Sequence, residues 1–285
     1  MHSIRSIATR HGTLSVIDSG GVGFPFVLLH GSGSRKEIFA PLLAERVTSN
    51  TRIIAIDLPG HGASADAVDP EAAYGIAGLA EAVVDVIDAL SLSAFGLLGW
   101  SLGGHLGIEV LGRDARVKGL MVVGAPPVSP GPLGMLRAFQ TNFDLLLASK
   151  EHFTERDTQR FFELCFHGNG GPEDLAAVQR ADGRLRPVFV RSMMRGEGVD
   201  QRRVVEETSV PLAIINGADE PFARLSYVRS LLYRRLWDGY CYEMEGAGHA
   251  PFIDLPGAFG DLFLRFAGDV AAEAAAPARV LRRAG

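Results

Sequence analysis

Short apolar runs that alternate with helical stretches are the feature that most constrains how this chain can fold. The runs fall at residues 26–29, 53–56, 95–98, 120–123 and 212–215, and no charged residue interrupts them. Continuous apolar runs of this length suit strands that are covered on both faces. The stretches between them, at residues 38–46, 76–90 and 102–111, have helical patterning. This alternation, preceded by a hairpin of residues 4–8 and 14–17, predicts a mostly parallel, doubly wound α/β sheet.

The alternation stops after Ala125 and resumes at Pro211. The intervening segment has helical patterning at residues 135–149, 155–166 and 173–180 and no convincing strand. A long insertion between two strands of a regular sheet is typical of a lid or cap. We therefore expect a core of residues 1–126 and 208–267 with a helical cap at residues 127–207. The Ala-rich end, residues 268–285, is expected to be a flexible tail.

The composition is that of a globular protein without a basic surface. It holds 28 Lys and Arg against 33 Asp and Glu, a formal charge of -5, which argues against nucleic-acid binding. Two cysteines are too few for a disulfide framework and fit a reducing compartment. No apolar run approaches the roughly 18 residues of a membrane span. The sequence thus predicts a soluble, cytoplasmic protein that binds neither nucleic acid nor membranes, and it gives no indication of oligomeric state.

A serine stands at the turn between a predicted strand and a predicted helix. Residues 99–103 read Gly-Trp-Ser-Leu-Gly; they follow the apolar run 95–98 directly and lead into the helical stretch 102–111. In this context the G-x-S-x-G pattern is typical of a nucleophile elbow, a strained turn that exposes the serine at the edge of the sheet. The helix N-terminus also favours developing negative charge. We identify Ser101 as the candidate nucleophile.

A serine nucleophile needs a base within hydrogen-bond reach, and the base needs an orienting carboxylate. His249 follows the last predicted strand, residues 240–244, in a glycine-rich loop that could project its ring over the sheet edge. The loop after residues 211–216 offers two adjacent acids, Asp219 and Glu220. In loops of this type the acid commonly stands three residues after the glycine, which favours Glu220 and leaves Asp219 as the alternative.

Acyl transfer also needs N–H donors aimed at the oxyanion. The amide of Leu102, directly after the nucleophile, is one candidate. The other is the amide of Ser32, in the glycine-rich loop 30–33 that follows the first parallel strand. His30 and His61 lie in turns of the first half of the chain, where we expect them to brace the backbone.

Metal and nucleotide chemistry find little support in the sequence. Its histidines are not spaced i, i+2 or i, i+4, and it has no Cys-x-x-Cys. It lacks both a G-x-G-x-x-G after the first strand and a phosphate-binding G-x-x-x-x-G-K-[ST] loop. We expect no metal and no cofactor.

With these residues on such a sheet, the chain resembles the α/β-hydrolase superfamily over residues 10–267. Four strings, at residues 57–62, 99–105, 216–222 and 247–252, together resemble the metal-independent N-acyl-homoserine lactonases of this fold. The resemblance implies a cap over the substrate, with Phe161, Trp100 and Gly31 as candidate binding residues. Ser32 stands where that group would lead us to expect Asn, and Phe161 stands near the place of a Tyr hydroxyl.

The sequence thus predicts a serine hydrolase for a small-molecule ester or lactone. The resemblance implies opening of the homoserine lactone ring of acylated signal molecules. A general carboxylesterase or a carbon-carbon bond hydrolase would share the same triad and stays open as an alternative. A ligand receptor that has kept a hydrolase body is a further alternative of a different class, against which the intact triad argues.

Overall fold

An eight-stranded sheet forms the centre of the computed structural model, which describes residues 2–43, 50–141 and 143–276. The strand order is β1-β2-β4-β3-β5-β6-β7-β8. β1 and β2 pair in antiparallel fashion, β2 is antiparallel to β4, and the other neighbours are parallel. The strands are β1 (Ser3–Thr9), β2 (Gly12–Asp18), β3 (Phe24–Leu29), β4 (Thr51–Ile56), β5 (Phe95–Trp100), β6 (Val117–Val123), β7 (Leu212–Gly217) and β8 (Tyr242–Met244). The predicted hairpin and all five apolar runs are confirmed as strands.

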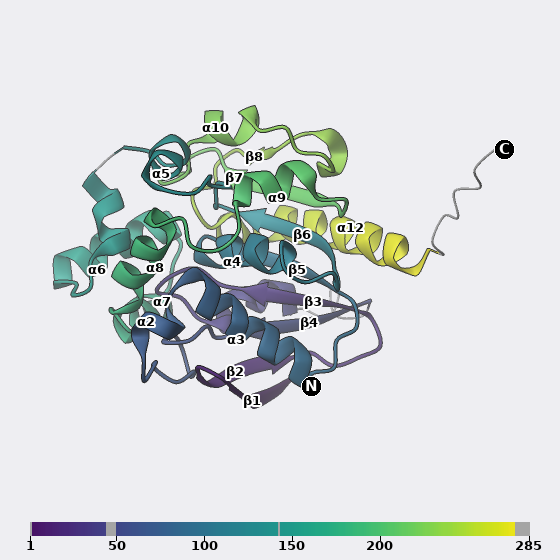
Figure 1. The fold of residues 1–285 in the computed structure, drawn as a ribbon, viewed down its shortest axis with the longest axis horizontal. Helices are drawn as coiled ribbons and strands as arrows, with labels where there is room; N and C mark the ends of the chain where they lie inside the picture. The colour runs from purple at the N-terminus through teal and green to yellow at the C-terminus, as the bar shows by residue number, and fades with distance from the viewer. Residues whose placement is uncertain (1, 44–49, 142, 277–285) are drawn as a thin grey trace.

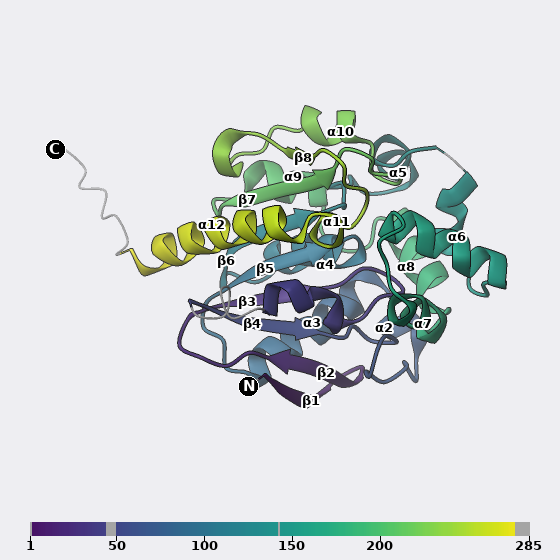
Figure 2. The same ribbon diagram turned by 180° about the vertical axis from the view of Figure 1, so that it is seen from behind.

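Helices cover both faces of the sheet, which explains why its central strands are apolar without alternation. One face carries α3 (Ile76–Ala89) and α4 (Leu102–Leu111), seen in front in Figure 1. The other carries α12 (Pro256–Ala275), in front in Figure 2, and the 3-10 helix η1 (Lys36–Leu43). Along β3, Val27 and Leu29 belong to the core on the first face, and Phe26 and Leu28 to the core on the second.

The predicted helices of the core are confirmed at residues 76–89 and 102–111. The stretch expected at residues 38–46 is a 3-10 helix that begins at Lys36 and contains Pro41, a residue that disfavours an α-helix. Its expected end at residues 44–46 lies outside the described residues. Four short elements complete the described part of the core: α2 (Pro70–Ala73), α10 (Leu225–Ser230), the 3-10 helix η3 (Trp237–Gly239) and α11 (Pro251–Asp254).

The expectation of a flexible tail from residue 268 is wrong for its first part. α12 continues to Ala275, and Val270 on it is fully buried. Val270 packs so closely against Gly119 of β6 that a Cβ on this glycine would lie 2.4 Å from the valine Cγ2. The alanines of this segment favour helix, and burial of Val270 anchors the helix to the sheet. The rest of the expected tail, residues 277–285, lies outside the described residues.

The insertion between β6 and β7 is helical. It contains α5 (Pro132–Ala138), the 3-10 helix η2 (Phe143–Ser149), α6 (Glu155–Phe166), α7 (Pro172–Arg180), α8 (Leu185–Met194) and α9 (Gln201–Glu207). The stretches expected at 155–166 and 173–180 are confirmed as α6 and α7. The single helix expected at 135–149 is instead two separate helices, α5 and η2.

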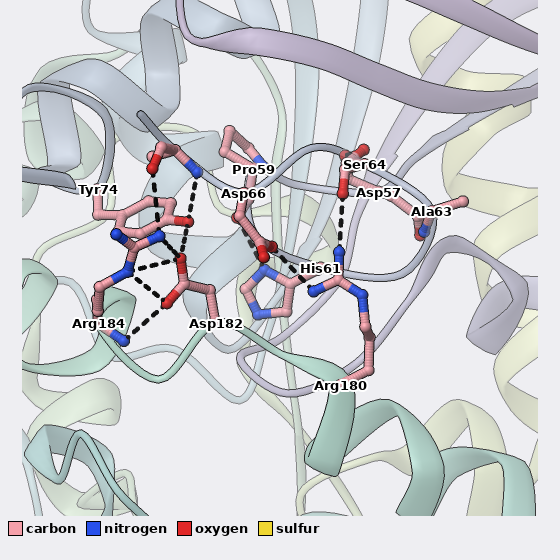
Figure 3. A network of polar contacts seen from close by, with 11 residues as sticks. Asp57, Pro59, His61, Ala63, Ser64, Asp66, Tyr74, Arg180, Asp182 and Arg184 are labelled. Atoms are coloured by element: carbon pink, nitrogen blue, oxygen red, sulfur yellow. Dashed lines mark hydrogen bonds and ion pairs between the residues drawn. The ribbon is translucent and has the colours of Figure 1, made fainter. Parts of the chain in front are cut away.

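Polar contacts join the insertion to the loop that follows β4 (Figure 3). The backbone N–H of Asp182 donates to Gly60 O at 2.8 Å, and the buried Tyr74 hydroxyl donates to the Asp182 carboxylate at 2.5 Å. Nearer the surface, Arg180 pairs with Asp66 at 2.9 Å. These contacts fix the start of α8 relative to the sheet edge where the candidate residues lie.

Candidate active site

Ser101 lies in a sharp turn between β5 and α4, as the elbow pattern predicts. Its backbone has φ 53° and ψ -117°, an unusual conformation for a residue with a side chain, which costs roughly 1–3 kcal/mol. The turn is held by the Ser101 N–H, which donates to Val123 O at 2.8 Å, and by the Gly104 N–H, which donates to Ser101 O at 2.8 Å. Gly103 is required because a Cβ there would lie 2.0 Å from Leu29 O. The sheet therefore enforces the strained turn.

His249 and Glu220 form a buried pair beside this turn. The His249 Nδ1 lies 2.9 and 2.8 Å from the two carboxylate oxygens of Glu220, and the residues are 2% and 4% exposed. The amides of Phe222 and Ala223 also donate to Glu220 Oε1, at 2.9 and 3.2 Å, and so orient the carboxylate. A ring nitrogen facing a carboxylate carries the proton, which leaves Nε2 free to act as a base.

The neighbouring acid is placed differently. Asp219 is exposed, and its backbone N–H donates to Ala247 O at 3.0 Å. Its carboxylate makes no hydrogen bond to His249 among those found in the described residues. Of the two alternatives left by the sequence, the geometry therefore favours Glu220.

Three further residues hold the His249 ring and backbone in place. Trp100 Nε1 donates to His249 O at 2.7 Å, and the Phe222 ring packs edge-on against the imidazole with centroids 4.7 Å apart. Gly124, at the end of β6, has φ +60°, and a Cβ there would lie 2.8 Å from His249 Nδ1 and 3.2 Å from Glu220 Oε2. A glycine at this position is therefore needed to leave room for the pair.

A cavity of about 400 Å³ brings the candidate residues together. Ser101, His249, Ser32 and Leu102 contribute to its wall from the core. Apolar side chains from the insertion form most of the remainder, including Met135, Phe161, Phe189 and Met193. Another cavity, of about 500 Å³, lies among polar residues 151–158 and 178–186 and contains none of the candidate catalytic residues. The first cavity is therefore the candidate substrate site.

The loop of residues 30–33 is braced by two buried histidines, as expected. His30 Nε2 accepts from the Leu58 N–H, and His61 Nε2 accepts from the Gly33 N–H, both at 3.0 Å. The Nε2 atom of each ring is thus a hydrogen-bond acceptor. Burial lowers the pKa of both histidines, so both rings are neutral. Because Gly33 already uses its N–H, the neighbouring Ser32 amide is the donor left for a ligand.

The two predicted oxyanion donors have no other hydrogen-bond partner within the described ranges. Leu102 is the first residue of α4, so its amide has no intrahelical acceptor. No hydrogen bond found in residues 2–43 uses the Ser32 N–H either. Both residues line the cavity beside Ser101. Donors without an internal partner are what the predicted oxyanion site requires, and the role of these two amides stays a prediction.

Of the three residues expected to bind substrate, only Phe161 lines the cavity. Trp100 is 1% exposed and packs against Phe166, Phe252 and the His249 ring, behind the cavity wall. Gly31 lies behind it as well, where a Cβ would come within 3.0 Å of the Trp100 ring. A Cβ on Gly31 would also lie 3.2 Å from the Ser101 Cβ, so this glycine adjoins the nucleophile. The substrate contacts expected of Trp100 and Gly31 stay predictions.

Sequence reasoning missed Gly124 and the pair formed by His105 and Gln201. A glycine directly after a predicted strand was the only local signal for Gly124. His105 was placed in the elbow helix without a role, yet its Nδ1 lies 2.9 Å from Gln201 Oε1, and its ring lines the cavity. Gln201 stands 96 residues away in the chain, so no spacing rule could have paired them.

Within the described residues, no group of three or more His, Cys, Asp or Glu side chains is arranged to hold a metal ion. In the same part of the chain, no helix is long and apolar enough to cross a membrane.

The sheet order and the turn between β5 and α4 are features of the α/β-hydrolase fold. Residues 26–262 match the model of the alpha/beta hydrolase family, and the chain belongs to this family.

Relatives cover nearly the whole chain. Crystal structures of the N-acyl homoserine lactonase AidH match with 37% identity and a TM-score of 0.91, covering 95% of this chain and 98% of that one. The pimeloyl-[acyl-carrier protein] methyl ester esterase of Xanthomonas axonopodis pv. citri (strain 306) is 28% identical over 89% of this chain and 99% of its own length. The esterase RhEst1 from Rhodococcus sp. ECU1013, 23% identical with a TM-score of 0.74 over 94% of this chain and 99% of its own, shares the fold. The protein is thus an ester hydrolase of the α/β-hydrolase fold.

Proposed function

We propose that this enzyme opens the lactone ring of N-acyl-homoserine lactones. The observation that carries the proposal is the 37% identity to AidH over nearly the full length of both chains, one AidH structure being a complex with N-hexanoyl homoserine lactone. The mostly apolar cavity of about 400 Å³ above Ser101 supports it, because an acyl chain needs an apolar site.

In this proposal Ser101, His249 and Glu220 act as nucleophile, base and orienting carboxylate. The Ser101 oxygen attacks the ring carbonyl while its proton passes to His249 Nε2. The carboxylate of Glu220 holds Nδ1–H and stabilises the imidazolium that forms. The amides of Ser32 and Leu102 donate to the oxyanion, each contributing about 3 kcal/mol of barrier lowering.

Collapse of the tetrahedral intermediate breaks the ring C–O bond, and His249 returns the proton to the leaving alkoxide. In a lactone this alkoxide stays attached to the acyl-enzyme, so re-closure of the ring competes with hydrolysis as an intramolecular reaction. A water molecule activated by the same His249 must therefore attack rapidly to release the N-acyl-homoserine.

The insertion, residues 127–207, acts in this proposal as a cap that forms the roof of the acyl site. Met135, Phe161, Phe189 and Met193 supply that roof from α5, α6 and α8. A cytoplasmic location, expected from the cysteine content, is part of the same proposal.

The proposal is tested by measuring acid release from acyl-homoserine lactones of several chain lengths beside hydrolysis of p-nitrophenyl esters and a carboxylic methyl ester. A chelator is included to exclude trace metal activity. We expect lactone opening to be the fastest reaction and to be insensitive to the chelator. Ser101→Ala should lower kcat by at least about 10⁴-fold. Ser230→Ala, at an exposed serine on α10, is the matched control and should leave kcat unchanged.

Activity on esters without activity on lactones would replace the proposal by a general esterase. Labelling with a fluorophosphonate probe distinguishes a lactonase or an esterase from a ligand receptor, since only an activated serine reacts with the probe. Folded protein that neither labels nor turns over any ester would overturn the enzymatic assignment of Ser101.

A further inference from the structure

Among the polar side chains of the cavity that have no part in the mechanism above, His105 lies on the same helix as the nucleophile elbow. His105 is 5% exposed, lines the cavity with Ser101 and His249, and lies on the elbow helix α4. It stands four residues after Ser101, and its backbone N–H donates to Ser101 O at 3.2 Å. Ser101 is the N-cap of α4, and this hydrogen bond spans the first turn of the helix. The His105 ring is therefore one helical turn from the nucleophile.

The protonated nitrogen of this ring is fixed by Gln201. Gln201 Oε1 lies 2.9 Å from His105 Nδ1 and accepts from the Val128 N–H at 3.4 Å. Its Nε2 donates to the His105 carbonyl at 3.5 Å. A backbone N–H can only donate and a carbonyl can only accept, so these two contacts set the orientation of the amide. Nδ1 must then carry the hydrogen, and Nε2 is a bare acceptor.

The ring is also neutral. Burial is the main cause that lowers the pKa of His105 to about 4, and the nearby His249 lowers it further. No hydrogen bond found in the described residues uses Nε2. The rings of Phe139 and Phe189 flank the imidazole, with centroids 5.8 and 6.2 Å away. The cavity thus presents one neutral nitrogen acceptor in apolar surroundings, close to the nucleophile.

We propose that His105 Nε2 accepts a hydrogen bond from an amide N–H on the carbon next to the scissile carbonyl, and so selects substrates with an α-acylamino group. The inference rests on the proposed function, since such an amide is part of every N-acyl-homoserine lactone. The amide nitrogen is two bonds from the carbon that Ser101 attacks, so an acceptor one helical turn away is within reach. Gln201 is the positioning residue that keeps Nε2 unprotonated.

The physical basis of the selection is the penalty for leaving a desolvated group unpaired. An isosteric substrate without the N–H places an ether-type oxygen against the lone pair of Nε2, and neither group can donate. Sites built to hydrogen-bond a particular substrate group discriminate strongly against analogues that lack it.

The test compares two lactones on the unaltered enzyme: an N-acyl-homoserine lactone and the α-acyloxy-γ-butyrolactone of equal chain length, in which oxygen replaces N–H. We expect kcat/KM to be about 10- to 100-fold higher for the amide, the ratio that one desolvated hydrogen bond supplies. His105→Leu should remove most of this ratio by slowing the amide substrate. His105→Gln, whose carbonyl can accept, should restore part of it. Val190→Ala, at an apolar cavity residue, is the matched control and should keep the ratio.

The outcomes separate this inference from the proposed function. If lactones are not opened but esters are, the same comparison is made with p-nitrophenyl N-acetylglycinate and p-nitrophenyl acetoxyacetate. A preference for the amide that depends on His105 then supports the inference although the lactonase proposal has failed. Equal kcat/KM for both members of a pair on the unaltered enzyme, or an equal loss on both in His105→Leu, overturns the inference.

Discussion

The two walls of the substrate cavity are built in different ways. The wall from the core is polar, buried and closely hydrogen-bonded: His249 meets Glu220 at 2.8 Å, and His61 accepts from Gly33 at 3.0 Å. Asp57 beneath the same loops accepts from the backbone N–H and Nζ of Lys36 at 2.6 and 2.7 Å while being 0% exposed. A buried polar group that loses one of these partners pays a large desolvation penalty, so these loops have little freedom to move.

The wall from the insertion is mostly apolar. Met135, Phe189 and Met193 line the cavity. Apolar side chains make van der Waals contacts, which depend less on direction than hydrogen bonds do. The insertion is attached to the core partly through ion pairs near the surface, such as Arg180 with Asp66. The flexible thioether side chains can adapt to ligands of different shape.

The difference suggests a division of tasks. In the proposed mechanism the core wall sets the position of the nucleophile, the base and the oxyanion donors, and small displacements there should be costly. The wall from the insertion sets which acyl groups fit, and changes there should alter preference more than rate. Four pairs of substitutions test this division, and their expected effects differ by several orders of magnitude.

The largest effect is expected for Glu220→Gln. The amide can present an NH₂ group to His249 Nδ1, which stabilises the wrong tautomer of the base, so kcat should fall by about 10⁴-fold. Asp219→Asn is the matched control at the exposed neighbouring acid and should leave kcat within a factor of about 3. Steady-state kinetics on one substrate measure both. If Asp219→Asn abolishes turnover and Glu220→Gln retains it, the assigned acid is the wrong one.

A smaller but still large effect is expected for Gly124→Ala. The new Cβ would lie 2.8 Å from His249 Nδ1 and must displace the pair, so kcat should fall about 100-fold. Gly239→Ala is the matched control, because Gly239 has a similar φ of +80° but nothing within 4 Å of a new Cβ. Both variants suffer the same kind of backbone strain, and urea unfolding should detect similar losses of stability. Equal kcat values in the two variants would contradict the role assigned to Gly124.

The sequence predicted the features that depend on neighbours along the chain. The elbow at Ser101 and the loop of His249 were recognisable because each follows an apolar strand directly. The choice between Asp219 and Glu220 stayed open, since it depends on where the two side chains point once the loop has folded. The backbone conformation of the folded loop leaves Asp219 exposed and buries Glu220, and the spacing of residues in the sequence does not reveal this difference.

Features that join distant segments were not predictable in this way. The resemblance gave Trp100 as a candidate binding residue, but its ring contacts Phe166, Phe252 and His249, and these partners stand far away in the sequence. Its ring therefore packs behind the wall. Val270 was expected in a flexible Ala-rich tail, but it packs against Gly119, 151 positions earlier, and extends the buried face of α12 on the sheet. Gln201 and His105 meet across 96 positions.

In the wall from the insertion, Met135→Ala should change preference and leave the chemistry intact. Removing this side chain enlarges the cavity, so substrates with acyl chains longer by two or three methylenes should gain about 10-fold in relative kcat/KM. Turnover of p-nitrophenyl acetate should be unchanged. Leu133→Ala, on the same helix but 70% exposed and outside the cavity, is the control and should keep the original chain-length profile. A large drop in kcat on all substrates would place Met135 with the catalytic wall instead.

The smallest effect is expected for the surface attachment of the insertion. Arg180 and Asp66 have side chains 41% and 50% exposed, and ion pairs of this kind contribute about 0–1 kcal/mol, so Asp66→Asn should barely change the free energy of unfolding. Tyr74→Phe provides the contrast. The Tyr74 hydroxyl is buried, donates to Asp182 at 2.5 Å and accepts from the Ala67 N–H at 2.8 Å. Its loss leaves the Ala67 N–H unpaired and removes one of the partners of Asp182, which keeps Arg184, so it should cost about 1–3 kcal/mol. Urea unfolding of both variants measures the difference. Since the buried contact between Tyr74 and Asp182 positions the insertion, only Tyr74→Phe should also raise KM. An equal rise in KM in Asp66→Asn would show that the ion pair of Arg180 and Asp66 also helps to hold the roof of the cavity.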